Sequence, residues 1–206
     1  MSGNRSRKLV RQSRALGIAL SPKAEKYMQR RSYRPGEHGR GRVKDSDYSV
    51  RLKEKQRLRA QYGIREAQMR RVWEEARRAE GLSGENLVEL LEMRLDALVL
   101  RAGFARTIAQ ARQVVVHRHL LVDGKIVDRP SFRVKPGQIV QVKPKSQTSP
   151  QFHVAAQGAH RDVLPQVPGY LDVDLEKLRF TLTRRPKRAE VPVICDVQMV
   201  VEHYSR

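Results

Sequence analysis

The sequence predicts an α+β protein of 206 residues, and three observations support this. Residues 45–92 carry apolar residues at helical spacing between capping residues and glycines. Residues 104–130 begin with a helical pattern and end in a hairpin signal, and short strand patterns follow. Residues 1–44 are dense in Lys and Arg and have few periodic apolar positions. We therefore expect a helical domain, a small module in which a helical pair leads into a twisted antiparallel sheet, and a basic N-terminal arm.

The positive charge is concentrated in two parts of the chain. The formal net charge is +20 at pH 7. Lys and Arg minus Asp and Glu give +11 for residues 1–44 and +8 for residues 93–150. Residues 45–92 are neutral, and residues 151–206 carry +1. This distribution predicts a polyanionic partner, for which nucleic acid, an anionic membrane surface and an acidic protein are the candidates.

The composition also argues against several protein classes. No run of ~18 apolar residues exists, which excludes a membrane-spanning helix. The N-terminal residues lack a long apolar stretch and a small-residue cleavage site, so we expect no secretory signal, and their Arg and Ser content favours a transit peptide only weakly. The single cysteine, Cys195, cannot form an internal disulfide and lies in an apolar run typical of a core. A reducing, cytoplasmic setting is expected.

The basic arm, residues 1–44, has two interpretations. In "YRPGEHGRGRVK", Pro and Gly are interspersed with Arg and Lys, a composition that buries too little surface to order strongly by itself. It suits an arm laid along phosphates, with glycines that let the backbone approach closely. A solvated, disordered tail would have the same composition. The second cationic segment favours the phosphate-binding arm.

Helices are expected across the neutral segment. The first opens at the capping residues Asp45, Ser46 and Asp47 and closes at Gly63. The second is "REAQMRRVWEEARRAEG", which stops at Gly81. The third is "SGENLVELLEMRLDALVLRAG", whose leucines recur at helical spacing. The large apolar side chains of these segments are interpreted as core.

A polar, cationic stripe runs along the helix expected from residue 107. Thr107 followed by Gln110 matches a capping box, and a helix N-terminus beside Arg106 suits a phosphate. A solvated helix face would look the same, but the surrounding excess of cations favours RNA binding, because the surface for a neutral partner would mix signs. The stripe comprises Arg106, Gln110, Gln113 and His117, flanked by Arg112, and the opposite face carries Ile108, Ala111 and Val115.

The rest of the chain predicts strands and a docked C-terminus. "LLVDGKIV" is a hairpin signal with a tight turn at Asp123–Gly124, and Pro136–Gly137 precedes another strand. "TSPQFHVAAQG" favours a helix, and "PGYLDVDLEKLRFTLTRRPKR" favours strands. The apolar closing segment is expected to pack on the earlier helices through Val200, Val201 and Tyr204.

Five motifs stand in an order that resembles one known family. They are "RRSYRPGEHG", "SDYSVRLKEKQRLRAQYGI", "LLEMRLDALVLRAGFA", "QARQVVVHRHLLVDGKIVDRPSFRVKPGQ" and "VVEHYSR". From about residue 30 to its end, the chain resembles the family of bacterial small-subunit ribosomal protein number four. Residues 93–150 alone resemble the RNA-binding module that pseudouridine synthases also carry, and the flanking motifs favour the ribosomal family.

The resemblance implies an architecture and a set of partners. It implies a helical domain of residues 45–92, completed by residues 179–206, with an inserted RNA-binding module of residues 93–178. It implies binding to a helix junction in the 5′ domain of small-subunit ribosomal RNA, early in assembly. It further implies a position near incoming messenger RNA and contact with neighbouring small-subunit proteins, notably number five, where the contact affects translational accuracy. Some members also repress their own messenger.

The resemblance and the charge pattern assign residues to these partners. Residues 40, 42 and 44 correspond to the stretch near incoming messenger RNA, and Glu202, Tyr204 and Arg206 correspond to the neighbour-protein side. The residues expected to face RNA are Arg30, Arg31, Arg34, His38, Arg40, Arg42, Lys44, Tyr48, Arg51, Lys53, Lys55, Arg57, Arg106, Thr107, Gln110, Arg112, Gln113, His117, Lys125, Arg129, Ser131 and Arg133.

The chain departs from the family at its N-terminus. Many members hold zinc there through cysteines, and this segment has none. A structural zinc site needs four Cys or His ligands, and the six histidines lack metal spacing. We predict no zinc and no other cofactor, with the arm ordered by RNA instead.

No catalytic motif is found in the sequence. Walker, Gly-x-Ser-x-Gly and His-Glu-x-x-His patterns are absent. Asp96 lies among leucines in "RLDAL", and we expect it to form an ion pair with a nearby Arg. A protein that is not an enzyme is therefore expected. An RNA-modifying enzyme would instead show turnover on RNA, and a DNA-compacting protein would also bind duplex DNA.

Overall fold

The computed structural model describes residues 2–42, 44–160 and 162–205 and divides the chain into two compact units. The first unit combines the chain up to Met69 with the chain from Val193 onward, and the second spans Arg70–Pro192. The division falls inside helix α4 (Glu66–Arg78). The expected helical segment 45–92 is thus shared between the units, and the expected module 93–178 lies within the second.

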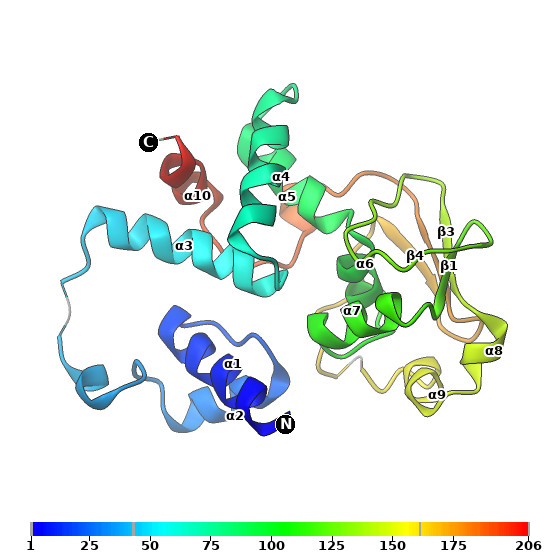
Figure 1. Ribbon diagram of the computed structural model, residues 1–206, viewed down its shortest axis with the longest axis horizontal. Coiled ribbons are helices and arrows are strands. Elements are labelled where there is room, and N and C mark those ends of the chain that lie inside the picture. Colours follow the sequence, from blue (N-terminus) through cyan, green and yellow to red (C-terminus); the bar gives the residue numbers. More distant parts are fainter. Residues whose placement is uncertain (1, 43, 161, 206) are drawn as a thin grey trace. The chain divides into compact units, whose positions relative to one another are not determined.

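The first unit is helical throughout (Figure 1). The expectation that the arm has little order of its own is wrong, because three helices lie within it. The reason is a small set of apolar contacts that periodicity did not reveal: Leu16, Ile18 and Ala24 are buried. The Ser13 hydroxyl stabilises the turn after the first helix, because it accepts from the backbone N–H of Leu20 at 3.2 Å. The helices of this unit are α1 (Ser2–Leu16), α2 (Pro22–Arg30), η1 (Glu37–Arg40), α3 (Asp47–Gln61) and α10 (Val197–Tyr204).

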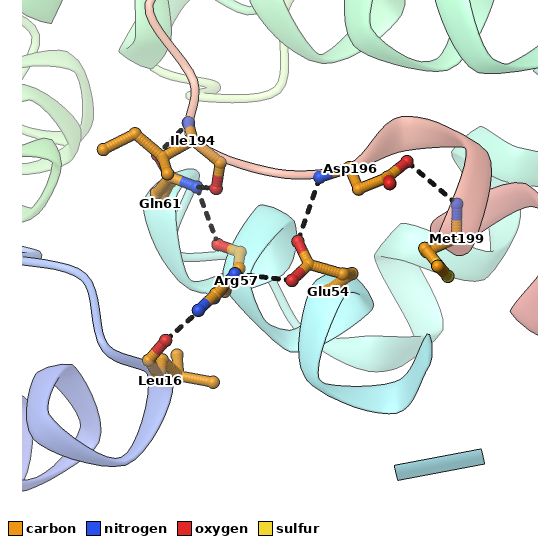
Figure 2. A network of polar contacts seen from close by, with 7 residues as sticks. All are labelled: Leu16, Glu54, Arg57, Gln61, Ile194, Asp196 and Met199. Atoms are coloured by element: carbon orange, nitrogen blue, oxygen red, sulfur yellow. Dashed lines mark hydrogen bonds and ion pairs between the residues drawn. The ribbon is translucent and has the colours of Figure 1, made fainter. Parts of the chain in front are cut away.

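Helix α3 holds both ends of this unit (Figure 2). Arg57 on α3 donates from Nε to Leu16 O at the end of α1, at 2.8 Å. Glu54, one turn earlier, accepts from Arg57 and from the backbone N–H of Asp196, the latter at 2.9 Å. The expected packing of the C-terminal segment on an earlier helix is confirmed, because α10 packs on α3 and Val200 is fully buried.

The second unit begins with the rest of α4, which is followed by α5 (Ser83–Glu92), α6 (Leu95–Arg101) and α7 (Ile108–Val116). The sequence predicted one continuous helix over α5 and α6, and the structure breaks it at Met93–Arg94. The break has a tertiary cause, since Val134 N–H donates to Met93 O at 2.9 Å and Arg94 forms an isolated bridge with Arg133. Shorter helices follow: α8 (Pro144–Gln147), α9 (Pro150–Ala156) and η2 (Arg188–Glu190).

A five-stranded antiparallel sheet completes this unit and confirms the α+β class. The strands are β1 (Leu120–Val122), β2 (Lys125–Ile126), β3 (Ile139–Val142), β4 (Leu171–Asp174) and β5 (Arg179–Leu182), in the order β2-β1-β3-β5-β4. Because β5 pairs with both β3 and β4, the sheet continues past residue 178, the expected end of the module. The return to the first unit begins at Val193.

One face of the sheet packs against the helices. Phe104, just after α6, meets Phe180 on β5 edge to face with ring centroids 5.5 Å apart. The predicted hairpin turn is confirmed, with positive φ at Asp123 (46°) and Gly124 (78°), as a type I′ turn requires. Figure 1 shows α6 and α7 beside the sheet, and a shared core of buried side chains joins the helices to it. The buried side chains of the face are Leu120, Val122, Val140, Val142, Phe180 and Leu182.

Candidate nucleic-acid interface

Helix α7 begins with the cap that the sequence predicts. Thr107 is the N-cap residue, and its hydroxyl accepts from the backbone N–H of Gln110 at 3.2 Å. The side-chain oxygen of Gln110 accepts in turn from the backbone N–H of Arg106 at 2.9 Å. The reciprocal cap is confirmed, with Arg106 in place of Thr107 as the second donor. Part of the Gln110 side chain is therefore occupied in ordering the start of the helix.

The two faces of α7 are those predicted. Ala111 and Val115 are buried, and Ile108 is half-buried. Val114, which the sequence did not single out, is also buried. The polar side exposes three residues that carry donors or positive charge: Arg106, Gln113 and His117.

Arg112 turns away from the predicted stripe. Its Nη2 donates to Oδ2 of the fully buried Asp96 at 2.7 Å. The expected ion pair of Asp96 is confirmed, and it includes both Arg94 and Arg112. Asp96 lies 16 residues earlier in the chain and shares its one negative charge between Arg94 and Arg112, so the charge of Arg112 is only partly offset. The contact of Arg112 with RNA stays a prediction. Periodicity places Arg112 at the edge of the stripe but gives no information about this acid.

The segment after the hairpin adds further polar groups. Arg129 and Ser131 are exposed, as is Lys125 at the hairpin. Arg133 is held differently: its Nη2 donates to Oε2 of Glu75 at 2.8 Å, and this hydrogen bond holds the pKa of Glu75 below its usual value. We refer to the exposed residues of α7 and of this segment as the α7 surface: Arg106, Gln113, His117, Arg129 and Ser131.

On α3, the predicted RNA-facing residues divide into two groups. Tyr48 is 61% exposed, and Lys53 is half-buried. Lys55 is buried instead, and its Nζ pairs with Oε1 of Glu66 at 3.0 Å. The side chain of Lys55 is therefore covered, because the start of α4 supplies an acid beside it, and its contact with RNA stays a prediction.

Two further α3 cations serve the interior of the first unit. The Arg51 side chain is only 11% exposed and lies 3.8 Å from Glu202. Arg57 is occupied by Glu54 and by Leu16 O, as Figure 2 shows. The sequence placed both among RNA contacts. Because α10 and α1 pack beside α3, these cations stabilise the unit itself.

The arm exposes cations around an anchored tyrosine. Arg14 and Arg40 place their guanidinium carbons 5.0 and 4.6 Å from the centroid of the Tyr33 ring. Arg14, which the sequence did not single out, also donates to Tyr33 O at 3.1 Å. Arg34 pairs with Asp45 at 3.0 Å. The exposed predicted residues of the arm are Arg30, Arg31, His38, Arg40, Arg42 and Lys44.

The C-terminal residues expected to meet a neighbouring protein are partly engaged within the unit. The hydroxyl of Tyr204 donates to Oε1 of Glu66 at 2.9 Å, and the Lys55 ammonium lies 5.9 Å from its ring centroid. Although burial raises it, hydrogen bonds from Lys55 and Tyr204 hold the pKa of Glu66 below its usual value. Glu202 keeps 42% of its side chain exposed. Arg206 lies outside the described residues.

In residues 2–42, 44–160 and 162–205, no group of three or more His, Cys, Asp and Glu side chains could hold a metal ion. Within the same ranges, no helix has the length and apolar character needed to cross a membrane. The zinc prediction rests on the sequence and stays a prediction.

The chain is similar to known proteins over its whole length. The model of the ribosomal protein S4/S9 N-terminal domain matches residues 4–92, and that of the S4 domain matches residues 93–140. The chain is 74% identical over 206 residues to small ribosomal subunit protein uS4 of Beutenbergia cavernae, covering 100% of this chain and 99% of that protein. It is 73% identical over 206 residues to the protein of the same name from an Arthrobacter species, with the same coverage. The counterpart from Micrococcus luteus is 72% identical over 208 residues, and both chains are covered completely.

Proposed function

The chain belongs to the ribosomal protein S4 family, and from this premise we propose that it binds a helix junction in the 5′ domain of small-subunit ribosomal RNA. Membership makes it a structural, RNA-binding constituent of the small ribosomal subunit in the cytoplasm, and not an enzyme. We propose further that it binds early in assembly, lies near incoming messenger RNA and contributes to translational accuracy through ribosomal protein number five.

The observation that carries the RNA proposal is the α7 surface. Arg106 and Arg129 are exposed, as are the polar side chains of Gln113 and His117, and the other face of α7 is buried in a core. Residues 93–150 carry +8, so acids do little to offset these cations. A rigid cationic surface of this kind matches the phosphates and sugar hydroxyls of a folded RNA better than it matches a neutral partner.

Affinity and selection arise from different parts of this arrangement. Exposed Arg and Lys side chains displace counterions from phosphates, which supplies affinity that depends on salt. The fixed geometry of α7 and residues 129–131 supplies selection, because contacts to phosphates and sugars recognise the shape of a junction. The exposed cations of the arm add affinity and support a contact with messenger RNA.

The contact with ribosomal protein number five draws support from the C-terminal helix. Glu202 exposes part of its carboxylate, while Tyr204 and Val200 fix the helix to its own unit. An exposed acid on a firmly docked helix suits a basic neighbour. No resident zinc is proposed, and metal analysis of the purified chain should find none; a stoichiometric amount would overturn that part of the proposal.

Co-sedimentation with small ribosomal subunits, followed by RNA footprinting, tests the function. We expect protection at one junction of the 5′ domain and binding that weakens steeply between low and moderate salt. A competition assay with duplex DNA separates this function from DNA compaction. The proposal fails if the folded chain shows no preference for the junction RNA over duplex DNA.

A further inference from the structure

A buried carboxylate connects the two segments of the α7 surface. Asp96 has no exposed area and lies in the first turn of α6. Arg94 donates to it from Nε to Oδ1 at 3.0 Å and from Nη2 to Oδ2 at 2.9 Å. Arg112, in the middle of α7, donates to Oδ2 from Nη2 at 2.7 Å and from Nε at 3.2 Å. One carboxylate therefore binds two guanidinium groups and fastens α7 to α6.

The backbone around this carboxylate holds the other segment. The Asp96 N–H donates to Pro130 O at 3.2 Å, and the Leu95 N–H donates to Phe132 O at 2.8 Å. Residues 130 and 132 flank Ser131, and residue 130 directly follows Arg129. These two hydrogen bonds therefore hold the exposed part of the segment in place. Asp96 thus touches both α7 and residues 129–131, through its side chain and its backbone respectively.

An exposed ion pair of the same unit provides a contrast. Arg118 and Asp128 are 2.9 Å apart, with side chains 68% and 41% exposed. Water and salt screen such a pair, so it constrains its segments little. The carboxylate of Asp96 is fully buried and is held by four hydrogen bonds from two guanidinium groups, so water does not screen its ion pairs and its geometry is firmly held.

We propose that Asp96 is a positioning residue for RNA recognition. Through Arg112 and the carbonyl of Pro130 it sets the placement of α7 relative to residues 129–131, and thereby the ability to distinguish one folded RNA from another. This inference rests on the proposed function. Arg112 acts through its ion pair with Asp96, which also binds Arg94, whereas Arg106 is exposed and meets phosphate directly.

The variant Asp96→Asn tests the inference, because a role in positioning and a role of charge alone change the affinity for RNA in opposite directions. Losing an acid near a polyanion strengthens binding if only charge matters. If Asp96 positions the surface, the full-length variant binds junction RNA about tenfold more weakly, the loss typical of misplaced contacts. Its affinity for an RNA duplex of equal length stays within about twofold, because phosphate contacts are retained. Asp128→Asn is the matched control, and it binds both RNAs as tightly as the original chain or more tightly.

A second pair of variants leaves the net charge unchanged. Arg112→Lys removes the two-pronged hydrogen bond to Asp96, and Arg118→Lys makes the same change at the exposed pair. We expect Arg112→Lys to lose selectivity for the junction with an unchanged salt dependence, and Arg118→Lys to lose none. Thermal melting of each chain checks whether it is folded at the assay temperature. If the Asp96→Asn chain is unfolded at that temperature, the selectivity of the Arg112→Lys chain tests the inference instead.

Two outcomes would overturn the inference. One is an Asp96→Asn chain that binds junction RNA as well as Asp128→Asn does. The other is an Arg112→Lys chain whose selectivity equals that of Arg118→Lys. Failure of the unmodified chain to prefer the junction would instead remove the proposed function, so the two failures are distinguishable.

Discussion

Gln61 and Ile194 bind each other twice, although 133 residues separate them in the sequence (Figure 2). The side-chain amide of Gln61 donates to the carbonyl of Ile194 at 3.0 Å. The backbone N–H of Ile194 donates back to the Gln61 side-chain oxygen at 3.0 Å. A single side chain thus satisfies both backbone groups of a segment without secondary structure, which aligns the chain for its entry into α10.

Gln61→Ala should loosen the C-terminal segment. The change removes three side-chain hydrogen bonds, two with Ile194 and one to Arg57 O, so we expect a loss of about 1–2 kcal/mol in the free energy of unfolding. Urea unfolding measures the loss, and hydrogen exchange at the Ile194 amide locates it. Gln56→Ala, which removes an acceptor for Arg59 on the same helix, is the control. Equal effects of the two substitutions would contradict the prediction.

Acid should weaken the docking of α10. Hydrogen bonds from Lys55 and Tyr204 outweigh the effect of burial and hold the pKa of Glu66 below the usual value of 4.5. The ionised form therefore stabilises the fold above pH 4.5, and this contribution is lost as the pH falls through the lower pKa of the folded state. The protection factors of residues 197–204, which correct for the slower intrinsic exchange in acid, should therefore fall at acid pH.

Glu66→Gln supplies the control for that pH dependence. The variant should have lower protection factors in α10 than the original chain at neutral pH, and these protection factors should change less on acidification. Glu74→Gln alters an exposed pair with Arg77 and should leave the exchange of α10 unchanged. A Glu66→Gln chain with the same acid response as the original would show that another group is responsible.

Thr107→Ala should destabilise the start of α7. Loss of the hydroxyl that caps Gln110 N–H costs about 0.5–2 kcal/mol in the free energy of unfolding. Thr107→Ser retains the hydroxyl and should lose much less. Thermal unfolding of both variants checks this, and similar losses for Ala and Ser would show that the methyl group matters more than the cap.

Exposed cations of the α7 surface should contribute to the salt dependence of RNA binding. Arg106→Gln and Arg129→Gln should each lower the slope of log affinity against log salt by about one, because each removes a phosphate contact. Arg118→Gln removes a cation already paired with Asp128 and should change the slope less. Filter binding over a salt series measures all three. Unchanged slopes for Arg106→Gln and Arg129→Gln would remove these residues from the interface.

Several parts of the fold could be predicted because their signals lie within a few residues. The caps at Ser46 and Thr107 and the turn at Asp123–Gly124 depend on local backbone hydrogen bonds and dihedral angles. The break at Met93 could not be predicted, because its cause is a hydrogen bond from Val134, far along the chain. The helices of the arm could not be predicted for a similar reason, since a few buried side chains order them and the sequence of the arm has no long apolar stripe.

The sequence alone determined the class of the protein, its two cationic segments and its family, because composition, charge and motif order do not depend on how the chain packs. Tertiary structure decided which of the cations remain available to a partner. Arg106 stays exposed, whereas Lys55 and Arg112 turn to Glu66 and Asp96. The physical reason is that an ion pair depends on distance through space. Helical periodicity predicts which residues share a face of a helix, but it does not predict which acid from another part of the chain will lie against that face.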